Sequence, residues 1–378
     1  MARTLSAYQA RAQLDVTVCS TNWRIPDRGE ALDNSTYIEG GVTYRYFQSW
    51  TPLLISLSMN KWFQINLKLF DIVHIHGLYR FPVTSAAWWA RKTKVPFLIR
   101  PHGSLDPFLF NQSRYNLLLK RIYERLFDLP NLNHADAVHY STEEEAKRAA
   151  FLKLRSKSIV VPNGIDWENF NCLPAKGSFR RFLKIDAKTP LVLFLGRINF
   201  AKGLDLLILS FALVARQNPD ARLAVVGPDN EGYRTKVRHW CKEQKVQDKV
   251  FFVDHLGLKM VKEAYVDSDV FVLTSYTESF GLTVVEAMAS ETPVIISDQV
   301  KTWREVQRAG AGIMVNLDPV SVSTAINLLL SNQAKAKSMG LRGRAAAKEL
   351  YAWPCIVDQL TQAYMELIEE KKVSNVCR

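Results

Sequence analysis

The hydrophobic positions of the chain form short strand-like runs that alternate with amphipathic helix patterns. A helix at 2–12 comes first, followed by a strand at 15–20, a β-like alternation at 34–50 and an amphipathic helix at 52–70. Further strands are expected at 71–77, 96–103, 136–141 and 158–165, with helices at 82–93, 114–128 and 142–153. Strand, helix and strand at this spacing predict a parallel sheet with right-handed crossovers.

The same alternation restarts after a polar segment, 172–188, which we interpret as the linker into a second domain. The later strands are expected at 191–196, 222–227, 249–254, 269–275, 293–297 and 312–315, and the helices at 203–217, 232–244, 258–267, 281–290, 302–308, 319–331 and 333–349. We therefore predict an α/β protein with two doubly wound domains, at 1–175 and 185–350, and a last helix at 355–371.

The composition agrees with a large globular protein. Of the 378 residues, 48% are hydrophobic and 23% are charged, which is enough for a sizeable core in two domains. No apolar run approaches the roughly 20 residues of a spanning helix, so we expect neither a membrane span nor a secretory signal. The five cysteines include no C-x-x-C pair, and we expect reduced thiols without a structural disulfide or zinc site.

The net charge of +12 is concentrated in the first half, because residues 1–180 carry 23 Lys and Arg against 15 Asp and Glu. A nucleic acid, an anionic membrane surface and phosphorylated small molecules are the alternative partners, and a solvated basic face without function is the fourth reading. A polybasic block of the kind that binds nucleic acid is missing. The aromatic helix at 52–70 either packs on the sheet or faces a membrane.

Ligands of open parallel sheets bind beyond the carboxyl ends of the strands. The strand at 191–196 ends in Gly196, which allows a ligand to approach the backbone, and Gly227 ends the next strand in the same way. Arg197 and Lys202 supply positive charge beside the start of a helix, a combination that suits a diphosphate, although surface cations on a loop are the plainer interpretation.

The segment 277–297 places two carboxylates at another strand end. Glu278 precedes a glycine turn, and Glu286 lies little more than one turn into the following helix. Carboxylates accept hydrogen bonds from hydroxyl groups, so a sugar is a plausible ligand class, and a capping acid beside a surface acid is the alternative.

The first domain offers histidines at its strand ends. His74 and His76 point to the same side of one strand, and His102 follows Arg100 after the next, close to Asp106. A single histidine is usually structural, whereas three near strand ends favour a functional one. No metal-binding spacing links them, so metal ligation is the weaker interpretation.

These segments together resemble a known family. TESFGLTVVEAMASETPVI is similar to the E-x7-E signature of glycosyltransferase family 4, whose retaining enzymes have the GT-B fold of two Rossmann-like domains facing each other across a cleft. LGRINFAKGLDLLILSFA resembles the diphosphate-binding loop of the family, and VVPNGIDWENF its junction between domains. The resemblance extends from about Asp15 to Met365.

The resemblance implies roles for the residues that match. Arg197 and Lys202 match the catalytic cations that hold the leaving diphosphate, Glu286 the acid that binds the ribose hydroxyls, and Glu278 the acid at the donor sugar. The implied donor-binding residues are Gly196, Arg197, Lys202, Gly227, Glu278, Phe280, Gly281, Leu282 and Glu286.

The acceptor side matches the family more loosely. His102 stands where a family histidine lies near the donor sugar and acceptor, and His76 and Gly103 are acceptor-side candidates. The helix at 355–371 is implied to pack back on the first domain. Because fixed cations stabilise the leaving group in this family, no metal and no cofactor is expected.

The implied function is a bacterial hexosyltransferase that moves a sugar, with retention, from a nucleotide-diphosphate sugar to a glycan or lipid-linked acceptor in cell-surface polysaccharide synthesis. It is expected in the cytoplasm or peripherally at the inner face of the plasma membrane, without nucleic acid. The alternatives are transfer to a small soluble acceptor and a degenerate binding protein without turnover.

The beginning of the chain departs from the family pattern. Family members begin with a strand and a Gly-rich loop before a helix that ends near the position of Ala12, whereas Met1 falls inside that helix. The first domain is therefore expected to lack its first strand. Our hypothesis at this point is a start site placed too far downstream or a truncated gene.

Overall fold

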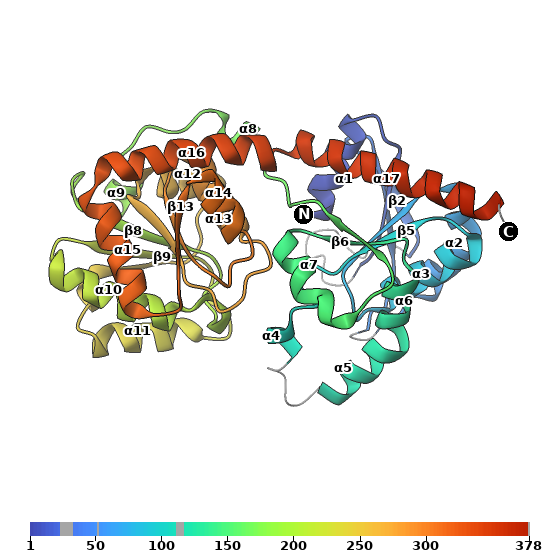
Figure 1. Ribbon diagram of the computed structural model, residues 1–378, viewed down its shortest axis with the longest axis horizontal. Coiled ribbons are helices and arrows are strands. Elements are labelled where there is room, and N and C mark those ends of the chain that lie inside the picture. Colours follow the sequence, from blue (N-terminus) through green and yellow to red (C-terminus); the bar gives the residue numbers. More distant parts are fainter. Residues whose placement is uncertain (23–32, 51–52, 111–116, 377–378) are drawn as a thin grey trace. The chain divides into compact units, whose positions relative to one another are not determined.

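The computed structural model describes residues 1–22, 33–50, 53–110 and 117–376 of the chain. The fold consists of two compact units, one formed by Met1–Gly164 with Trp353–Arg378 and the other by Ile165–Ala352 (Figure 1). Each unit has helices around parallel strands, as the alternating pattern predicted.

The first unit begins with a helix, α1 (Ala2–Arg11), and its described strands fall into two sheets. In one sheet β3 pairs in parallel with β1 and antiparallel with β2, and in the other β4, β5, β6 and β7 follow one another in parallel. The strands are β1 (Val16–Thr21), β2 (Ser35–Glu39), β3 (Val42–Phe47), β4 (Val73–His76), β5 (Phe97–Arg100), β6 (Ala137–Tyr140) and β7 (Lys157–Val160). Among the described residues, β1 and β4 therefore each have a strand partner on one side only.

The predicted helix at 52–70 is a shorter helix, α2 (Leu57–Asn66), followed by a 3-10 turn at Leu67–Leu69. It begins where it does because the hydroxyl of Ser56 accepts a hydrogen bond from the backbone N–H of Met59 at 3.3 Å. Met59 and Phe63 are buried in the core of this unit, so one face of the helix does pack on the sheet.

The other helices of the first unit follow the predicted alternation. They are α3 (Phe81–Thr93), α4 (Pro107–Phe110), α5 (Leu117–Tyr123), α6 (Leu129–His134) and α7 (Glu143–Ala149). Of the helix predicted at 114–128, residues 114–116 lie outside the described residues, and a π-helical turn at Glu124–Asp128 joins α5 to α6.

The last helix, α17 (Trp353–Val376), completes the first unit. Its residues Trp353, Ile356 and Leu360 are buried in one cluster with Leu5 of α1 and Leu98 of β5. The indole of Trp353 lies directly on Gly164, where an added Cβ would come within 2.3 Å of the ring. Gly164 therefore leaves the space that the returning helix needs.

The second unit has a six-stranded parallel sheet with the order β10-β9-β8-β11-β12-β13. The strands are β8 (Leu191–Leu195), β9 (Arg222–Val226), β10 (Val250–Val253), β11 (Val270–Leu273), β12 (Val294–Ser297) and β13 (Gly312–Val315). The central strands are apolar throughout because helices cover both faces. The direction of winding reverses between β8 and β11, which makes their carboxyl ends the place where such sheets bind ligands.

The helices of the second unit include two that precede its sheet. They are α8 (Glu168–Asn171), α9 (Ser178–Phe182), α10 (Leu204–Gln217), α11 (Tyr233–Glu243), α12 (Leu258–Asp267), α13 (Leu282–Ala289), α14 (Trp303–Ala309), α15 (Pro319–Ser331) and α16 (Gln333–Tyr351). No helix in the described ranges of the chain is both long and apolar enough to cross a membrane.

The polar segment at 172–188, interpreted above as a linker, is part of the second unit. Phe179 is fully buried there, and Arg180 is buried with its Nη2 at 3.0 Å from a carboxylate oxygen of Asp269. Asp267 accepts hydrogen bonds from the backbone N–H groups of Phe179 and Arg180. Arg180 of this segment and the carboxylates of Asp267 and Asp269 thus hold α9 in place. Gly164 is already the last residue of the first unit, ahead of the expected limit at 175.

Candidate active site

The carboxyl ends of β8 and β9 lie against each other through two glycines. Gly227 has a φ of +141°, and a Cβ at this position would lie 1.9 Å from the carbonyl oxygen of Gly196. Gly196 in turn donates its N–H to Val226 O at 2.9 Å. Gly227 is therefore needed for the close approach of one backbone to another, whereas a Cβ on Gly196 would meet only the ring of Phe194 at 3.6 Å. The predicted approach of a ligand to these two glycines stays a prediction.

The loop after β8 is packed directly onto the end of β11. Gly203 has a φ of +62°, and a Cβ there would lie 2.0 Å from Thr274 O. The N–H of Tyr276 donates to Ala201 O at 2.9 Å, and the rings of Phe200 and Tyr276 stack with centroids 5.4 Å apart. This contact fixes the loop that carries Arg197 and Lys202 relative to the loop that carries Glu278.

Lys202 and Glu278 form an ion pair between these two loops, with side chains only 14% and 17% exposed. The backbone of Glu278 is held by its N–H, which donates to Gln299 O at 3.2 Å, and by its carbonyl, which accepts from the N–H of Lys301 at 3.1 Å. Arg197 lies in the same loop as Lys202 with an exposed side chain. The structure therefore brings together the cation and the carboxylate that the sequence placed 76 positions apart.

Glu286 is held separately, by a residue that the sequence analysis did not single out. The hydroxyl of the fully buried Tyr265 donates to Glu286 Oε2 at 2.9 Å. Burial raises the pKa of the Glu286 carboxyl, and the hydrogen bond from Tyr265 opposes that rise. Tyr265 lies on α12, and nothing in its local sequence marks it as a partner of a glutamate on α13.

In the turn at 280–282, Phe280 has a structural role that the sequence analysis did not predict. Phe280 is buried, with its ring edge-on to Tyr351, and its carbonyl accepts a hydrogen bond from the hydroxyl of Thr302 at 2.9 Å. Gly281 has a φ of +78° and directly precedes Leu282, the first residue of α13. The N–H of Val284 already donates to Gly281 O at 2.8 Å, and the N–H groups that precede it at the N-terminus of this helix suit a polar ligand.

Further polar residues surround the same loops. Asp205 accepts a hydrogen bond from the hydroxyl of Tyr276 at 2.7 Å, and Arg234 donates to Gly227 O at 3.0 Å. Asn199 Oδ1 and Ser275 Oγ are buried without a hydrogen-bond partner in the described chain. The sequence signal that could have identified these residues is the presence of acidic, basic and amide side chains after strand-like runs.

In the first unit the histidines at the strand ends contact one another. His76 Nδ1 lies 3.0 Å from His102 Nε2, and the two rings stack with centroids 5.2 Å apart. His102 has a φ of +51°, and the N–H of Gly103 donates to Glu145 at 2.7 Å. Burial lowers the pKa of His76 to about 3 and that of His102 to about 4. Both imidazoles are therefore neutral near pH 7.

His74 belongs to a different, buried chain of hydrogen bonds. Its Nδ1 lies 2.7 Å from the hydroxyl of Tyr364 and its Nε2 lies 3.2 Å from His139 Nδ1. His139 Nε2 lies 2.8 Å from Val161 O, and Gln9 Nε2 donates to the Tyr364 hydroxyl at 3.1 Å. Because the carbonyl of Val161 can only accept, His139 carries its proton on Nε2, and its Nδ1 accepts from the Nε2–H of His74. His74 Nδ1 then accepts from the Tyr364 hydroxyl, so both nitrogens of His74 are occupied. His74 is thus structural, and its neighbour His139 escaped notice in the sequence.

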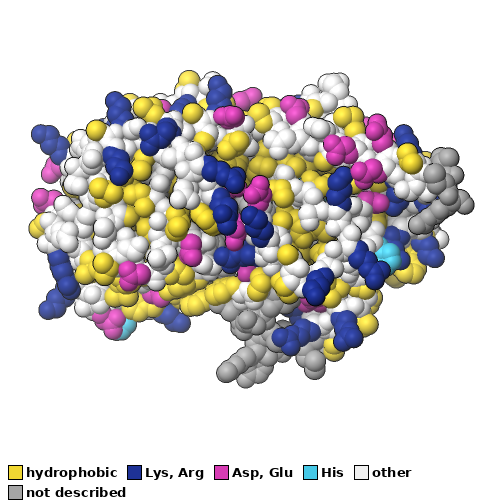
Figure 2. Space-filling model, viewed as in Figure 1, with side chains coloured by type: hydrophobic (Ala, Val, Ile, Leu, Met, Phe, Trp, Pro, Cys, Tyr) yellow, Lys and Arg dark blue, Asp and Glu magenta, His cyan; other side chains and the backbone are white. Residues whose placement is uncertain are grey.

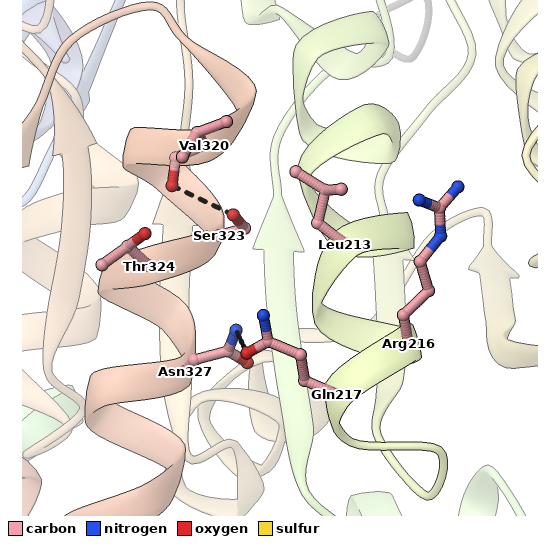
Figure 3. A pocket seen from close by; sticks show the side chains of 7 residues that line it. All are labelled: Leu213, Arg216, Gln217, Val320, Ser323, Thr324 and Asn327. Atoms are coloured by element: carbon pink, nitrogen blue, oxygen red, sulfur yellow. Dashed lines mark hydrogen bonds between the residues drawn. The ribbon is translucent and has the colours of Figure 1, made fainter.

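One surface groove of the second unit lies away from these strand ends. A groove of about 350 Å³ runs between α10 and α15 and includes Arg216 and Gln217 from the last turn of α10. Figure 3 shows Asn327 and Gln217 closing it through a hydrogen bond of 2.8 Å. Since α10 starts at the carboxyl end of the sheet, its last turn is at the end remote from Lys202.

Known families match both units. The model of Glycosyltransferase Family 4 matches residues 1–169, and that of Glycosyl transferases group 1 matches residues 176–346. The chain belongs to glycosyltransferase family 4. The predicted family and its GT-B fold are confirmed.

Individual family members are similar at low identity. D-inositol 3-phosphate glycosyltransferase of Kineococcus radiotolerans is 28% identical over 57% of this chain and 53% of its own length. The chain spans about half the length of the first curated relatives that it matches.

Solved structures of other proteins share the fold over most of the chain. Sucrose-phosphate synthase of Thermosynechococcus elongatus has a TM-score of 0.77 at 22% identity, covering 98% of this chain and 93% of that one. HepE of Anabaena, solved in complex with UDP-glucose, has a TM-score of 0.70 at 17% identity, covering 86% of this chain and 87% of that one.

Proposed function

We propose that this family 4 glycosyltransferase transfers a hexose, with retention of configuration, from a nucleotide-diphosphate sugar that binds at the carboxyl ends of β8 and β11. The observation that carries the proposal is the Lys202–Glu278 ion pair at the point where the sheet reverses its winding. A fixed cation and a fixed carboxylate side by side fit the two chemically different parts of such a donor, its diphosphate and its sugar hydroxyls.

The proposed division of roles follows from charge and exposure. Cleavage of the sugar–phosphate bond builds negative charge on the diphosphate, and Arg197 and Lys202 stabilise it there. Arg197 is exposed and free to turn toward a ligand, whereas Lys202 is held in place by Glu278. Glu278 accepts hydrogen bonds from the sugar, and Glu286 accepts them from the ribose. With two cations available for the leaving group, we propose that catalysis needs no metal and no cofactor.

The acceptor side is proposed to lie at His76 and His102 of the first unit. Their rings are in contact, both are neutral near pH 7, and His102 is exposed at the carboxyl end of β5. We propose a glycan or lipid-linked acceptor in bacterial cell-surface polysaccharide synthesis, with the enzyme peripheral at an anionic membrane face. The basic excess of the first half of the chain supports this choice of partner.

A second candidate is transfer to a small soluble acceptor. It is favoured by the names of the similar proteins reported above, which refer to an inositol phosphate and to sucrose phosphate. A screen of small phosphorylated acceptors against lipid-linked ones, with one active donor, separates the two candidates.

The proposed reaction is tested by the release of nucleoside diphosphate from a panel of UDP, GDP and ADP sugars. The wild type is expected to turn over at least one donor, and Lys202→Gln is expected to lower kcat by about 100–1,000-fold, the usual cost of removing one group that stabilises a developing charge. Lys242→Gln, on the exposed surface of α11, is the matched control. Equal kcat values for Lys202→Gln and the control refute the proposed role of Lys202.

A further inference from the structure

The region of the first unit around α2 and α3 is almost free of acidic residues. Residues 40–105 contain eight Lys and Arg but a single acidic residue, Asp71. On the face of the molecule drawn in Figure 2, Lys and Arg side chains are scattered among apolar ones and do not gather in one block. Four of the eight basic residues, Lys61, Lys68, Arg91 and Lys92, lie in α2, the 3-10 turn that follows it and α3.

The outward side of α2 and its following 3-10 turn combines apolar and basic side chains. Leu57, Ile65 and Leu69 are 62%, 54% and 74% exposed, and Lys61 and Lys68 are exposed between them. Spacings of three and four residues place these side chains on one face of a helix. This face is opposite to the one on which Met59 and Phe63 are buried. α2 therefore buries apolar side chains on one side and exposes a mixture of apolar and basic side chains on the other.

α3 extends the same surface. Asn60 of α2 accepts hydrogen bonds from Ser85 Oγ at 2.8 Å and from Trp89 Nε1 at 2.9 Å, which fix α3 beside α2 (Figure 1). The neighbouring Trp88 is 50% exposed, and Lys92 Nζ lies 5.2 Å from the centre of its ring.

The charges of this surface are not neutralised within the described residues. Arg91 of α3 is exposed beside Lys92, and no salt bridge in the described ranges involves Lys61, Lys68, Arg91 or Lys92. Their positive charge is thus available to an outside partner.

We propose that this surface docks the protein on an anionic phospholipid bilayer. The α2–α3 surface is defined by the exposed residues of the two helices and the 3-10 turn, namely Leu57, Lys61, Ile65, Lys68, Leu69, Trp88, Arg91 and Lys92. Basic side chains attract anionic headgroups, while exposed leucine, isoleucine and tryptophan side chains enter the boundary between headgroups and acyl chains. A bilayer, in which anionic headgroups adjoin apolar acyl chains, fits this mixture of basic and apolar side chains better than a purely polyanionic partner does.

The α2–α3 surface reaches the edge of the unit that carries the proposed acceptor side. The N–H of Phe81, the first residue of α3, donates to Leu53 O at 2.9 Å, so the chain entering α2 and the start of α3 meet. α3 starts four residues after Gly77, at the carboxyl end of β4 beside His76. The α3 residues of the surface, Trp88, Arg91 and Lys92, lie in the second half of that helix, away from its start. Docking at this surface specifies the membrane association given under the proposed function and rests on it.

Docking is tested by sedimentation of the full chain with vesicles of phosphatidylcholine alone and with 30% phosphatidylglycerol, a composition chosen at about physiological anionic content. The test variant is Lys61→Gln/Lys68→Gln/Arg91→Gln/Lys92→Gln. The matched control is Lys242→Gln/Lys245→Gln/Lys259→Gln/Lys337→Gln, which removes the same charge from exposed positions of the second unit. A third variant, Leu69→Ser/Trp88→Ser, keeps every charge.

The wild type is expected to bind the anionic vesicles only. The test variant is expected to lose binding by about five-fold for each charge removed, the control to keep it, and the third variant to bind more weakly at every salt concentration. Absence of wild-type binding at 0.1 M salt, or equal losses in the test variant and the control, overturns the proposal. Unchanged thermal unfolding and unchanged nucleoside diphosphate release in the test variant separate loss of docking from failure to fold and from failure of the proposed reaction.

Discussion

The hydrogen bond from Tyr265 to Glu286 allows a sharp test of how the second unit prepares its carboxylate. Tyr265→Phe removes one hydroxyl from a fully buried ring and leaves its packing unchanged. A hydrogen bond to a charged group contributes about 1.5–3 kcal/mol. For a unit of this size, a loss of 2 kcal/mol lowers Tm by roughly 4–8 °C.

The more specific consequence concerns the pKa of Glu286. Burial already raises it, and the Tyr265 hydroxyl favours the ionised form, so removing the hydroxyl raises the pKa further. A protonated Glu286 accepts hydroxyl hydrogen bonds poorly, so the KM for the donor should rise on the acidic side of neutrality.

The assay is the KM for the donor between pH 5.5 and 8.5 in Tyr265→Phe, with Tyr364→Phe of the first unit as a control that also loses a buried tyrosine hydroxyl. As the pH is lowered, the KM of Tyr265→Phe should begin to rise at a higher pH than that of the wild type. At acidic pH the two KM values should differ by up to about tenfold for each unit by which the pKa of Glu286 differs between the two proteins. Tyr364→Phe should lower Tm but leave the profile in place. An identical KM profile for Tyr265→Phe and the wild type refutes the role given to this hydrogen bond.

Two further predictions concern the backbone of the donor loop and the histidines of the first unit. Gly203→Ala places a Cβ 2.0 Å from Thr274 O, so it should displace the loop of Lys202 and abolish most donor turnover, whereas Gly257→Ala, with no atom within 4 Å of its Cβ, should be silent; equal kcat values in the two variants contradict this account of the loop. Burial depresses the pKa of His74 and His139 well below 6.5, so the unfolded chain takes up protons first and stability should fall as the pH drops below about 6.5. In urea unfolding between pH 5 and 6.5, His74→Phe should reduce that slope by up to about 1.4 kcal/mol per pH unit, and an unchanged slope speaks against a neutral buried His74.

The sequence predicted the second unit well because its signals are local. Each buried strand is an uninterrupted apolar run, so the strand expected at 191–196 is found at Leu191–Leu195, and the glycine that ends it is where it was expected. The pairing of Lys202 with Glu278 follows once both are placed at the carboxyl edge of one sheet.

Other contacts could not be predicted because they depend on packing between distant segments. His74 is held by Tyr364, 290 positions later, and the sequence shows neither partner to be structural. Arg180 and Lys188 made the segment 172–188 look like a linker, whereas the buried Phe179 and the capping carboxylate of Asp267 make α9 part of the second unit. The outward face of α2 was left open as a membrane or core surface, and its burial pattern shows that the core takes only one side.

The central claim, that the carboxyl ends of β8 and β11 hold a nucleoside diphosphate, is most directly tested by calorimetric titration of UDP, GDP and ADP. The account predicts that at least one of them binds the wild type with a stoichiometry of one, and that Arg197→Gln/Lys202→Gln weakens it by about 100-fold or more, since two charge-assisted hydrogen bonds are lost. Lys242→Gln/Lys245→Gln should bind like the wild type. Binding of equal strength in both double variants, or no binding of any of the three nucleotides to the wild type, would contradict the claim.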